Sequence, residues 1–233
     1  AGLLPALALA LLVSVGAMDA HAGRGASAAS AASAASANSY AERQDVRAFM
    51  AEMATQHGFD RTELENMFAH TRHDAAVIKA VMPPKDPSIR SWQTYRSRFV
   101  EPRRIAAGLA FRAANAATLA QAEARYGVPA DIILAIIGVE TIYGRNTGRF
   151  NVFGALTTLA FDYPPRAELF RRELEALLLL AREQQRSPLS YKGSFAGAIG
   201  LPQFLPSSLR RWGTDNDGDG VIDLSGSSSD AIG

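Results

Sequence analysis

The stretch that decides the fold is residues 128–140, which read VPADIILAIIGVE. The stretch is apolar on nearly every side of a helix, and we therefore expect it to form a buried central helix. Glu140 closes it and lies on the same helical stripe as three isoleucines: Ile133, Ile136 and Ile137. The sequence thus predicts one carboxylate at the end of an apolar helix.

A carboxylate in such a position costs free energy unless it is paired, neutral or at the mouth of a cleft. Desolvation raises its pKa, and a general acid that works near neutral pH needs a raised pKa. The alternative is that Glu140 simply reaches solvent at the helix end, where the helix dipole mildly disfavours a negative charge. Glu140 is therefore our candidate catalytic residue.

The remainder of the folded part also has helical patterns. Gly58 is expected to end a first amphipathic helix, and Asp60 to cap the next one. One long helix is predicted over residues 103–126 and another over residues 166–185, while three prolines within residues 81–87 predict an irregular link. Few segments alternate with a period of two, so the predicted fold class is mostly α.

The N-terminal residues have the pattern of an export signal. The apolar run at residues 3–15 is shorter than the roughly 20 residues of a membrane span, and an Ala-x-Ala sequence follows it. We expect a signal peptide over residues 1–22, although a buried helix is the alternative, and an Ala/Ser-rich linker over residues 23–39. The catalytic domain is expected over residues 40–233, truncated at its C-terminus. The exported protein would then be periplasmic, without a stable membrane anchor.

Composition excludes several classes. The chain has 24 basic and 23 acidic side chains, and a net charge of +1 gives no reason to expect a nucleic-acid partner. Absence of cysteine excludes disulfides, thiolate metal sites, a cysteine nucleophile and an acylated lipoprotein cysteine. No ATP-binding loop, catalytic triad signature or zinc-ligand spacing is present.

An acidic segment, residues 215–223, follows the first nine positions of an EF-hand calcium loop. Its first, third and fifth positions are Asp215, Asp217 and Asp219, and Val221 offers a backbone carbonyl at position seven. Position twelve is Gly226 where a glutamate is expected. We predict a bound Ca²⁺ with a structural, non-catalytic role; the alternative is a solvated acidic turn.

Several segments, taken in order along residues 40–233, resemble the membrane-bound lytic murein transglycosylase B family. They are YRSRF at 95–99, GVET at 138–141, YGR at 143–145, FDYPPRAE at 161–168, KGSFAGAIG at 192–200 and QFLPSS at 203–208. The resemblance implies a lysozyme-like (transglycosylase) core with an EF-hand-like calcium loop. It also implies cleavage of the β-1,4 bond between N-acetylmuramic acid and N-acetylglucosamine in peptidoglycan.

The same resemblance implies a reaction without water, which leaves a 1,6-anhydromuramoyl end. Glu140 matches the family's single glutamate and would act first as general acid and then as base. Because the sugar's own 6-hydroxyl attacks, no second carboxylate is needed, whereas an ordinary glycosidase requires two.

Further residues match by resemblance alone. Those that correspond to cleft residues holding sugar or peptide are Tyr95, Arg166, Ser194, Gln203 and Phe204. For Ser194 and Gln203, ordinary turn and helix-cap chemistry is the alternative. Pro165 stands where the family has an arginine, which puts one substrate contact in doubt. Asp230 matches the aspartate that closes the family's calcium loop.

Two other functions stay open from the sequence. One is a non-catalytic, calcium-dependent module that binds the cell wall on the same scaffold. The other is a hydrolytic muramidase of the same fold, for which Asp162 is the candidate second carboxylate.

Overall fold

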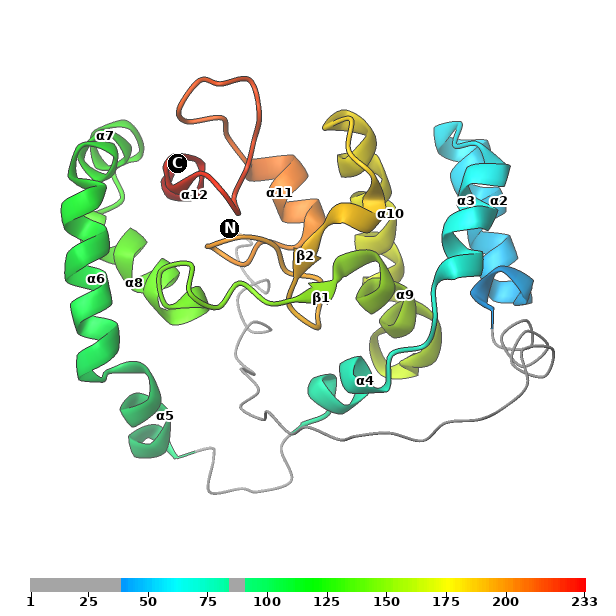
Figure 1. The fold of residues 1–233 in the computed structure, drawn as a ribbon, viewed down its shortest axis with the longest axis horizontal. Coiled ribbons are helices and arrows are strands. Elements are labelled where there is room, and N and C mark those ends of the chain that lie inside the picture. The colour runs from blue at the N-terminus through cyan, green and yellow to red at the C-terminus, as the bar shows by residue number, and fades with distance from the viewer. Residues whose placement is uncertain (1–38, 84–90) are drawn as a thin grey trace, which may run out of the picture.

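The computed structural model describes residues 39–83 and 91–233, and these are mostly helical (Figure 1). The helices are α2 Gln44–His57, α3 Arg61–His70, α4 Ala75–Val81, α5 Trp92–Phe99, α6 Pro102–Ala114, α7 Ala116–Tyr126, α8 Ala130–Thr141, α9 Val152–Asp162, α10 Ala167–Glu183, α11 Pro206–Trp212 and α12 Ser228–Ile232. The described ranges also contain three short 3-10 helices: η1 Tyr40–Glu42, η3 Pro164–Arg166 and η4 Pro188–Ser190. The predicted mostly α fold is confirmed. The predicted signal peptide, the linker up to residue 38 and most of the proline-rich link lie outside the described residues.

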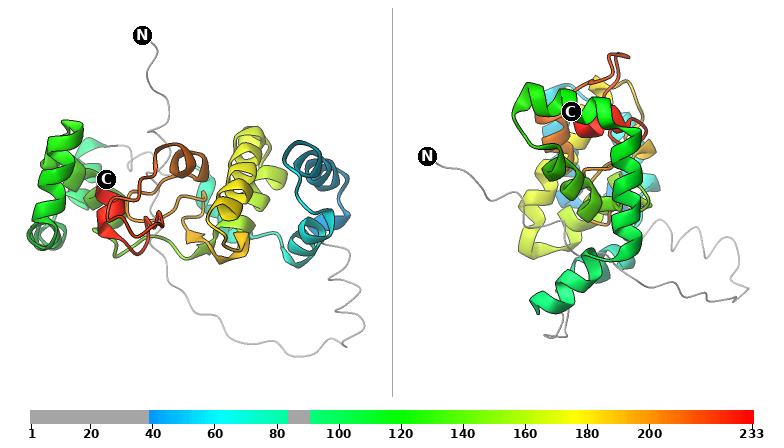
Figure 2. Two further views of the ribbon diagram at one scale, coloured as in Figure 1. Left: turned by 90° about the horizontal axis from the view of Figure 1, so that it is seen from above. Right: turned by 90° about the vertical axis from the view of Figure 1, so that its left-hand side faces the viewer.

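Two short strands, β1 Phe150–Asn151 and β2 Lys192–Gly193, pair antiparallel, with Phe150 opposite Gly193. Along the longest axis, α2 and α3 lie at one end of the molecule and α6 and α7 at the other (Figure 2). Within the described ranges, no helix is both long and apolar enough to cross a membrane.

The main core forms around α9 and α10. Helix α9 is buried along nearly its whole length, and α10 turns an apolar face of leucines against it, as its periodicity predicts. Phe49 of α2 and Phe68 of α3 join this cluster through edge-on contacts with each other and with Phe161. Each fully buried side chain of this kind contributes about 1.5–3 kcal/mol.

A second, smaller core holds α8 in place. Its buried members come from α7, α8, the loop at residue 201 and α12: Leu119, Ala122, Leu134, Ile137, Leu201 and Ile232. Helix α8 is therefore fixed by residues that lie on both sides of it in the sequence.

The ends of the predicted helices agree in part with the structure. Gly58 ends α2 with φ +68°, and Asp60 caps α3 by accepting a hydrogen bond from the Glu63 N–H at 2.9 Å. The helix predicted over residues 166–185 is present as α10. The prediction of a single helix over residues 103–126 is wrong, because the structure has two helices, α6 and α7, in this range.

Asn115 breaks that predicted helix into α6 and α7. Its side-chain amide donates to the Phe111 carbonyl at 2.9 Å, in competition with the helical backbone bonds. Its side-chain Oδ1 accepts a hydrogen bond from the Ser228 hydroxyl at 2.7 Å. A contact with a residue 113 positions away thus fixes the break.

The prediction that the central helix is buried on all sides is also wrong. Ile137 of α8 is 1% exposed, but Ile132 and Ile136 are 51% and 46% exposed. The hydrophobic sequence shows that exposure of these side chains to water costs free energy. It does not show which face of α8 is covered, because that depends on the neighbouring helices. Helix α8 therefore has one buried and one open face.

Candidate active site

Glu140 lies in the last full turn of α8 and is half-buried. Within residues 39–83 and 91–233, its carboxylate makes no hydrogen bond and no ion pair. Burial, without a compensating charge, raises the pKa of Glu140 to about 7. The carboxyl is therefore able to carry a proton near neutral pH and to donate it.

The chain turns sharply directly after Glu140. Ile142 and Tyr143 have φ angles of +53° and +57°, a left-handed conformation that is strained for a β-branched residue. The fully buried Thr141 holds this turn, because its hydroxyl donates to the Leu201 carbonyl at 2.8 Å and accepts from the Gly144 N–H at 3.0 Å. The strained turn is thereby fixed to a distant loop.

The Tyr143 ring fills a notch between α6 and α8. A Cβ atom at either Gly108 or Gly138 would lie 2.5 Å from the Tyr143 hydroxyl oxygen, so only glycine permits this packing. The ring of Phe111 packs beside it, with the ring centroids 5.4 Å apart.

Segment 192–204 approaches the loop that follows Glu140. A Cβ atom at Gly148 would meet the Gly193 carbonyl oxygen at 2.2 Å, which shows how closely the two backbones approach. Ser194 comes next, in a tight turn where its hydroxyl oxygen accepts from the Ala198 N–H at 3.0 Å. Ser194 thus makes the turn contact that was the alternative to a substrate role, and its O–H remains able to donate.

Gln203 is held rigidly in the same region. It has φ +55°, and its Nε2 donates to the Thr147 carbonyl at 3.1 Å and to the Gly200 carbonyl at 2.9 Å. Both donors are therefore used within the protein, and the Oε1 oxygen is the group left for a ligand. The neighbouring Phe204 forms a backbone bridge with Ile199 and packs against the main core.

The other two predicted cleft residues come from separate elements. Tyr95 of α5 stacks between Trp92 and Phe99, at centroid distances of 5.8 and 4.5 Å. Arg166 ends η3, and in the described part of the chain its guanidinium makes no hydrogen bond or ion pair. The structure brings Ser194 and Gln203 against the loop that follows Glu140, at Gly148 and Thr147, and no hydrogen bond or ion pair joins Arg166 to this loop.

Asp162, the candidate second carboxylate, is engaged elsewhere. It accepts hydrogen bonds from the Tyr40 hydroxyl, from Arg43 and from the His73 ring at 2.8 Å. Burial acts to raise the pKa of Asp162, but these three hydrogen bonds outweigh it and hold the pKa below its usual value. Asp162 therefore ties the N-terminal helices to α9 and forms no pair with Glu140.

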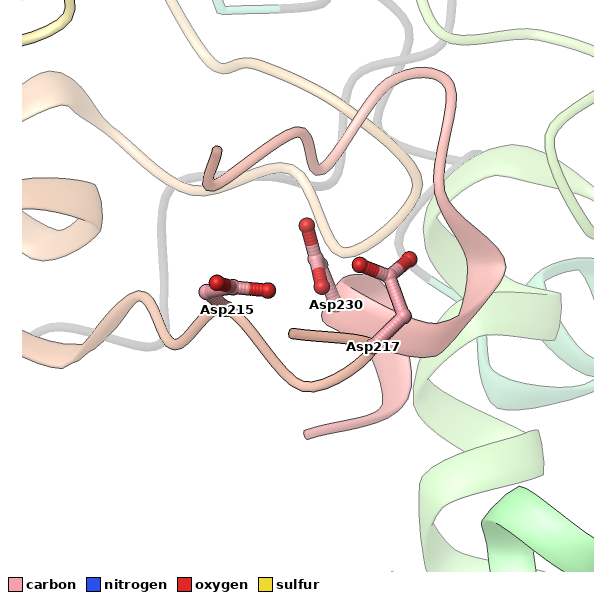
Figure 3. Close-up of side chains that lie close together, drawn as sticks. All are labelled: Asp215, Asp217 and Asp230. Carbon is pink, nitrogen blue, oxygen red and sulfur yellow. The ribbon is translucent and has the colours of Figure 1, made fainter. Parts of the chain in front are cut away.

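The acidic loop brings three predicted metal ligands together (Figure 3). Carboxylate oxygens of Asp215, Asp217 and Asp230 all lie within 4.8 Å of one another. Asp230 is 2% exposed, and its two oxygens accept from the backbone N–H groups of Asn216 and Asp223, each at 2.8 Å. The carboxylate of Asp219 is not in this group and accepts instead from the Val221 N–H at 2.8 Å.

Sequence reasoning missed Arg104, whose guanidinium reaches the carbonyls at the end of α8. No local pattern marks it, since 34 residues separate it from the first of these carbonyls. Sequence reasoning could have identified Thr141 and Tyr143, because both lie in segments that carry the family resemblance.

Fold and site define a lysozyme-like helical domain in which, among the described residues, the half-buried Glu140 has neither a hydrogen bond nor an ion pair. Residues 41–233 match the family described as the transglycosylase SLT domain, and the chain belongs to this family. The chain is 40% identical to membrane-bound lytic murein transglycosylase B of Escherichia coli (strain K12) over 194 residues. That match covers 79% of this chain and 54% of the relative, so the chain spans about half of its length. The predicted resemblance is confirmed.

Solved structures are similar along the same region. The catenated lytic transglycosylase SltB1 from Pseudomonas aeruginosa is 48% identical with a TM-score of 0.80, over 83% of this chain and 64% of that chain. Escherichia coli Slt35 in complex with calcium is 40% identical with a TM-score of 0.75, over 83% of this chain and 61% of that chain.

Proposed function

We propose that this chain carries the catalytic part of a peptidoglycan lytic transglycosylase. It would cleave the β-1,4 bond between N-acetylmuramic acid and N-acetylglucosamine and leave a 1,6-anhydro end. The observation that carries the proposal is the unpaired, desolvated Glu140, whose pKa near 7 suits both halves of an acid–base cycle. Family membership supports the substrate class.

In the proposed reaction Glu140 first donates its proton to the glycosidic oxygen. The bond from C1 of the muramic acid to this oxygen breaks, and the N-acetylglucosamine part leaves with a hydroxyl group. The substrate's N-acetyl group stabilises the positive charge at C1. The Glu140 carboxylate then takes the proton from the 6-hydroxyl as that oxygen bonds to C1, which restores the protonated acid.

The two alternatives have less support. Hydrolysis with two carboxylates needs a partner for Glu140, and Asp162 is held by Tyr40, Arg43 and His73. A non-catalytic binding module has no use for a carboxylate with a raised pKa. Mass spectrometry of the muropeptides released by the full-length protein tests all three. Anhydro ends are expected, reducing ends would indicate hydrolysis, and no release with bound glycan would indicate a binding module.

We assign the remaining substrate contacts as part of this proposal. Ser194 O–H and Gln203 Oε1 would bind polar groups of the sugar, since both lie against the loop that follows Glu140. Tyr95 would offer an aromatic face to a sugar ring, and Phe204 would support segment 192–204 through its bridge with Ile199 and its packing on the main core. Arg166 would contact the acidic groups of the peptide or lactyl side chain, with Pro165 unable to add a second charge.

The location follows from the substrate, which lies outside the cytoplasm. We propose that residues 1–22 direct export to the periplasm, that residues 23–39 form a linker and that residues 40–233 form the catalytic domain. The mature chain would begin near Gly23. N-terminal sequencing of the protein from its native host tests this, and an intact segment 3–15 in membranes would contradict it.

We also propose that the acidic loop binds Ca²⁺ as a structural ion. Three close carboxylates with hard oxygen donors fit this ion, and one of them is buried on two backbone N–H groups. Asp215, Asp217 and Asp230 would hold it, with Asp219 and the Val221 carbonyl completing the set. When bound, calcium would remove the repulsion between these charges and cross-link the loop to α12, without taking part in the reaction.

Calcium is expected to raise the melting temperature of the full-length protein. At a hundredfold excess over the dissociation constant, binding to the folded state alone adds about 2.7 kcal/mol. Thermal melts with Ca²⁺ and with chelator measure the shift. Asp217→Ala should abolish it, while Glu65→Ala, an exposed residue on α3, should keep it. Equal melting temperatures without calcium uptake in calorimetry would leave an ordinary acidic turn.

Turnover is expected to fall as the pH rises through about 7, because the proton on Glu140 is then lost.

The stability of the fold should depend on the protonation of the same carboxyl group. The pKa lies above the ordinary value of 4.5, so the folded state keeps the proton longer than the unfolded chain. Stability is therefore lost as the pH rises from about 4.5 to about 7, relative to Glu140→Gln. A kcat–pH profile and melts of both proteins check this.

A further inference from the structure

Arg104 of α6 holds the end of the helix that carries Glu140. Its Nη1 donates to the Gly138 carbonyl at 2.6 Å and to the Val139 carbonyl at 3.2 Å. Both carbonyls belong to the last turn of α8, where the regular helical hydrogen bonds end; the Gly138 carbonyl also accepts from the Ile142 N–H at 3.3 Å. A cation in this position also interacts favourably with the helix dipole.

The same guanidinium contacts α5. It lies over the Phe99 ring at 4.9 Å from the centroid, and Nη2 donates to the Arg98 carbonyl at 3.5 Å. Because Phe99 in turn stacks on Tyr95, one side chain links the helix that carries Tyr95 to the last turn of α8.

This placement is costly for stability. The Arg104 Nε is buried and has no hydrogen-bond partner in the described part of the chain. A buried donor without a partner destabilises the folded state. The turn it borders is itself strained, with Ile142 and Tyr143 at positive φ. Costs of this kind are retained where the geometry of a site depends on them.

We propose that Arg104 is a positioning residue for Glu140; this rests on the proposed catalytic role of Glu140. The Val139 carbonyl belongs to the peptide group that joins Val139 to Glu140. A hydrogen bond to this oxygen fixes the plane of that peptide group, and with it the direction in which the Glu140 side chain leaves the helix. Arg104 makes no hydrogen bond or ion pair with the Glu140 carboxylate, so it acts through the backbone.

The test compares Arg104→Met, Arg104→Lys and the control Arg103→Met in the full-length protein, with soluble glycan strands as substrate. Arg103 is the exposed neighbour of Arg104 on α6. In Arg104→Met we expect kcat to fall at least tenfold, because a misplacement of about 1 Å can cost about 10²-fold. KM should stay within about twofold of the wild-type value. Arg104→Lys should recover part of the loss, and Arg103→Met should behave as wild type.

A double-variant comparison separates positioning from general damage. Added to Glu140→Gln, Arg104→Met should cause no further loss, since the position of an absent acid no longer matters. Near-UV circular dichroism checks that each variant is folded; if Arg104→Met is not, Arg104→Lys enters the same comparison in its place.

Three outcomes would overturn the inference: a normal kcat in the Arg104 variants, a raised KM with unchanged kcat, or a loss that adds fully to that of Glu140→Gln. Retained activity in Glu140→Gln alone would instead overturn the proposed function.

Discussion

Glu140→Gln is expected to lose at least a hundredfold in kcat while it keeps the fold. The amide is nearly isosteric with the carboxyl but cannot donate or accept the proton, and general acid–base catalysis is worth roughly 10²–10⁴ in rate. Within the described ranges the Glu140 carboxylate makes no hydrogen bond or ion pair, so the substitution breaks none. Release of muropeptides from purified peptidoglycan measures the effect.

The matched control is Glu65→Gln, which makes the same chemical change at an exposed position of α3. It should leave turnover and melting temperature unchanged. Glu140→Gln should melt no lower than the wild type above pH 7, because it removes a partly desolvated charge. Normal turnover in Glu140→Gln would remove Glu140 from the mechanism and require another acid.

Gly148→Ala is expected to destabilise the protein by about 2–5 kcal/mol and to reduce turnover together with stability. The residue has φ +87°, which costs a non-glycine residue about 1–2 kcal/mol. The new Cβ would also lie 2.2 Å from the Gly193 carbonyl oxygen, and overpacking of this kind costs about 1–3 kcal/mol. Urea unfolding measures the first effect and muropeptide release the second.

Gly58→Ala separates the two causes. Gly58 has φ +68°, but nothing lies within 4 Å of a Cβ atom built there. It should therefore show only the backbone cost and keep full turnover. Equal unfolding free energies for the two variants would mean that the contact between residue 148 and β2 can open without loss. The close approach of Ser194 to the loop that follows Glu140 would then need another explanation.

The sequence determined much of the local structure. Helical periodicity predicted the mostly α fold, and the positions of Gly58 and Asp60 predicted the end of α2 and the start of α3. The apolar stretch ending in Glu140 identified one carboxylate as a candidate for desolvation, because its neighbours on the helix are apolar. The family resemblance rested on several short segments in a fixed order, which can be identified without knowledge of the fold.

Only the tertiary structure decided how these parts meet. It broke the helix predicted over residues 103–126 at Asn115, and it left one face of α8 open. Asp162 is held by Tyr40, Arg43 and His73, which no spacing in the sequence indicates. The EF-hand pattern does not reach Asp230, which only the family resemblance supplied, and the structure places it beside Asp215 and Asp217 through the Asn216 and Asp223 N–H groups.

The environment of Glu140 shows the same division. Thr141 and Leu201 are 60 residues apart, and Gln203 and Thr147 are 56 residues apart, yet both pairs are hydrogen-bonded. Periodicity records which side of a helix is apolar, because that depends on the residues of the helix itself. Which surface covers that side, and which distant carbonyl a side chain such as Arg104 reaches, depends on the packing of the whole chain.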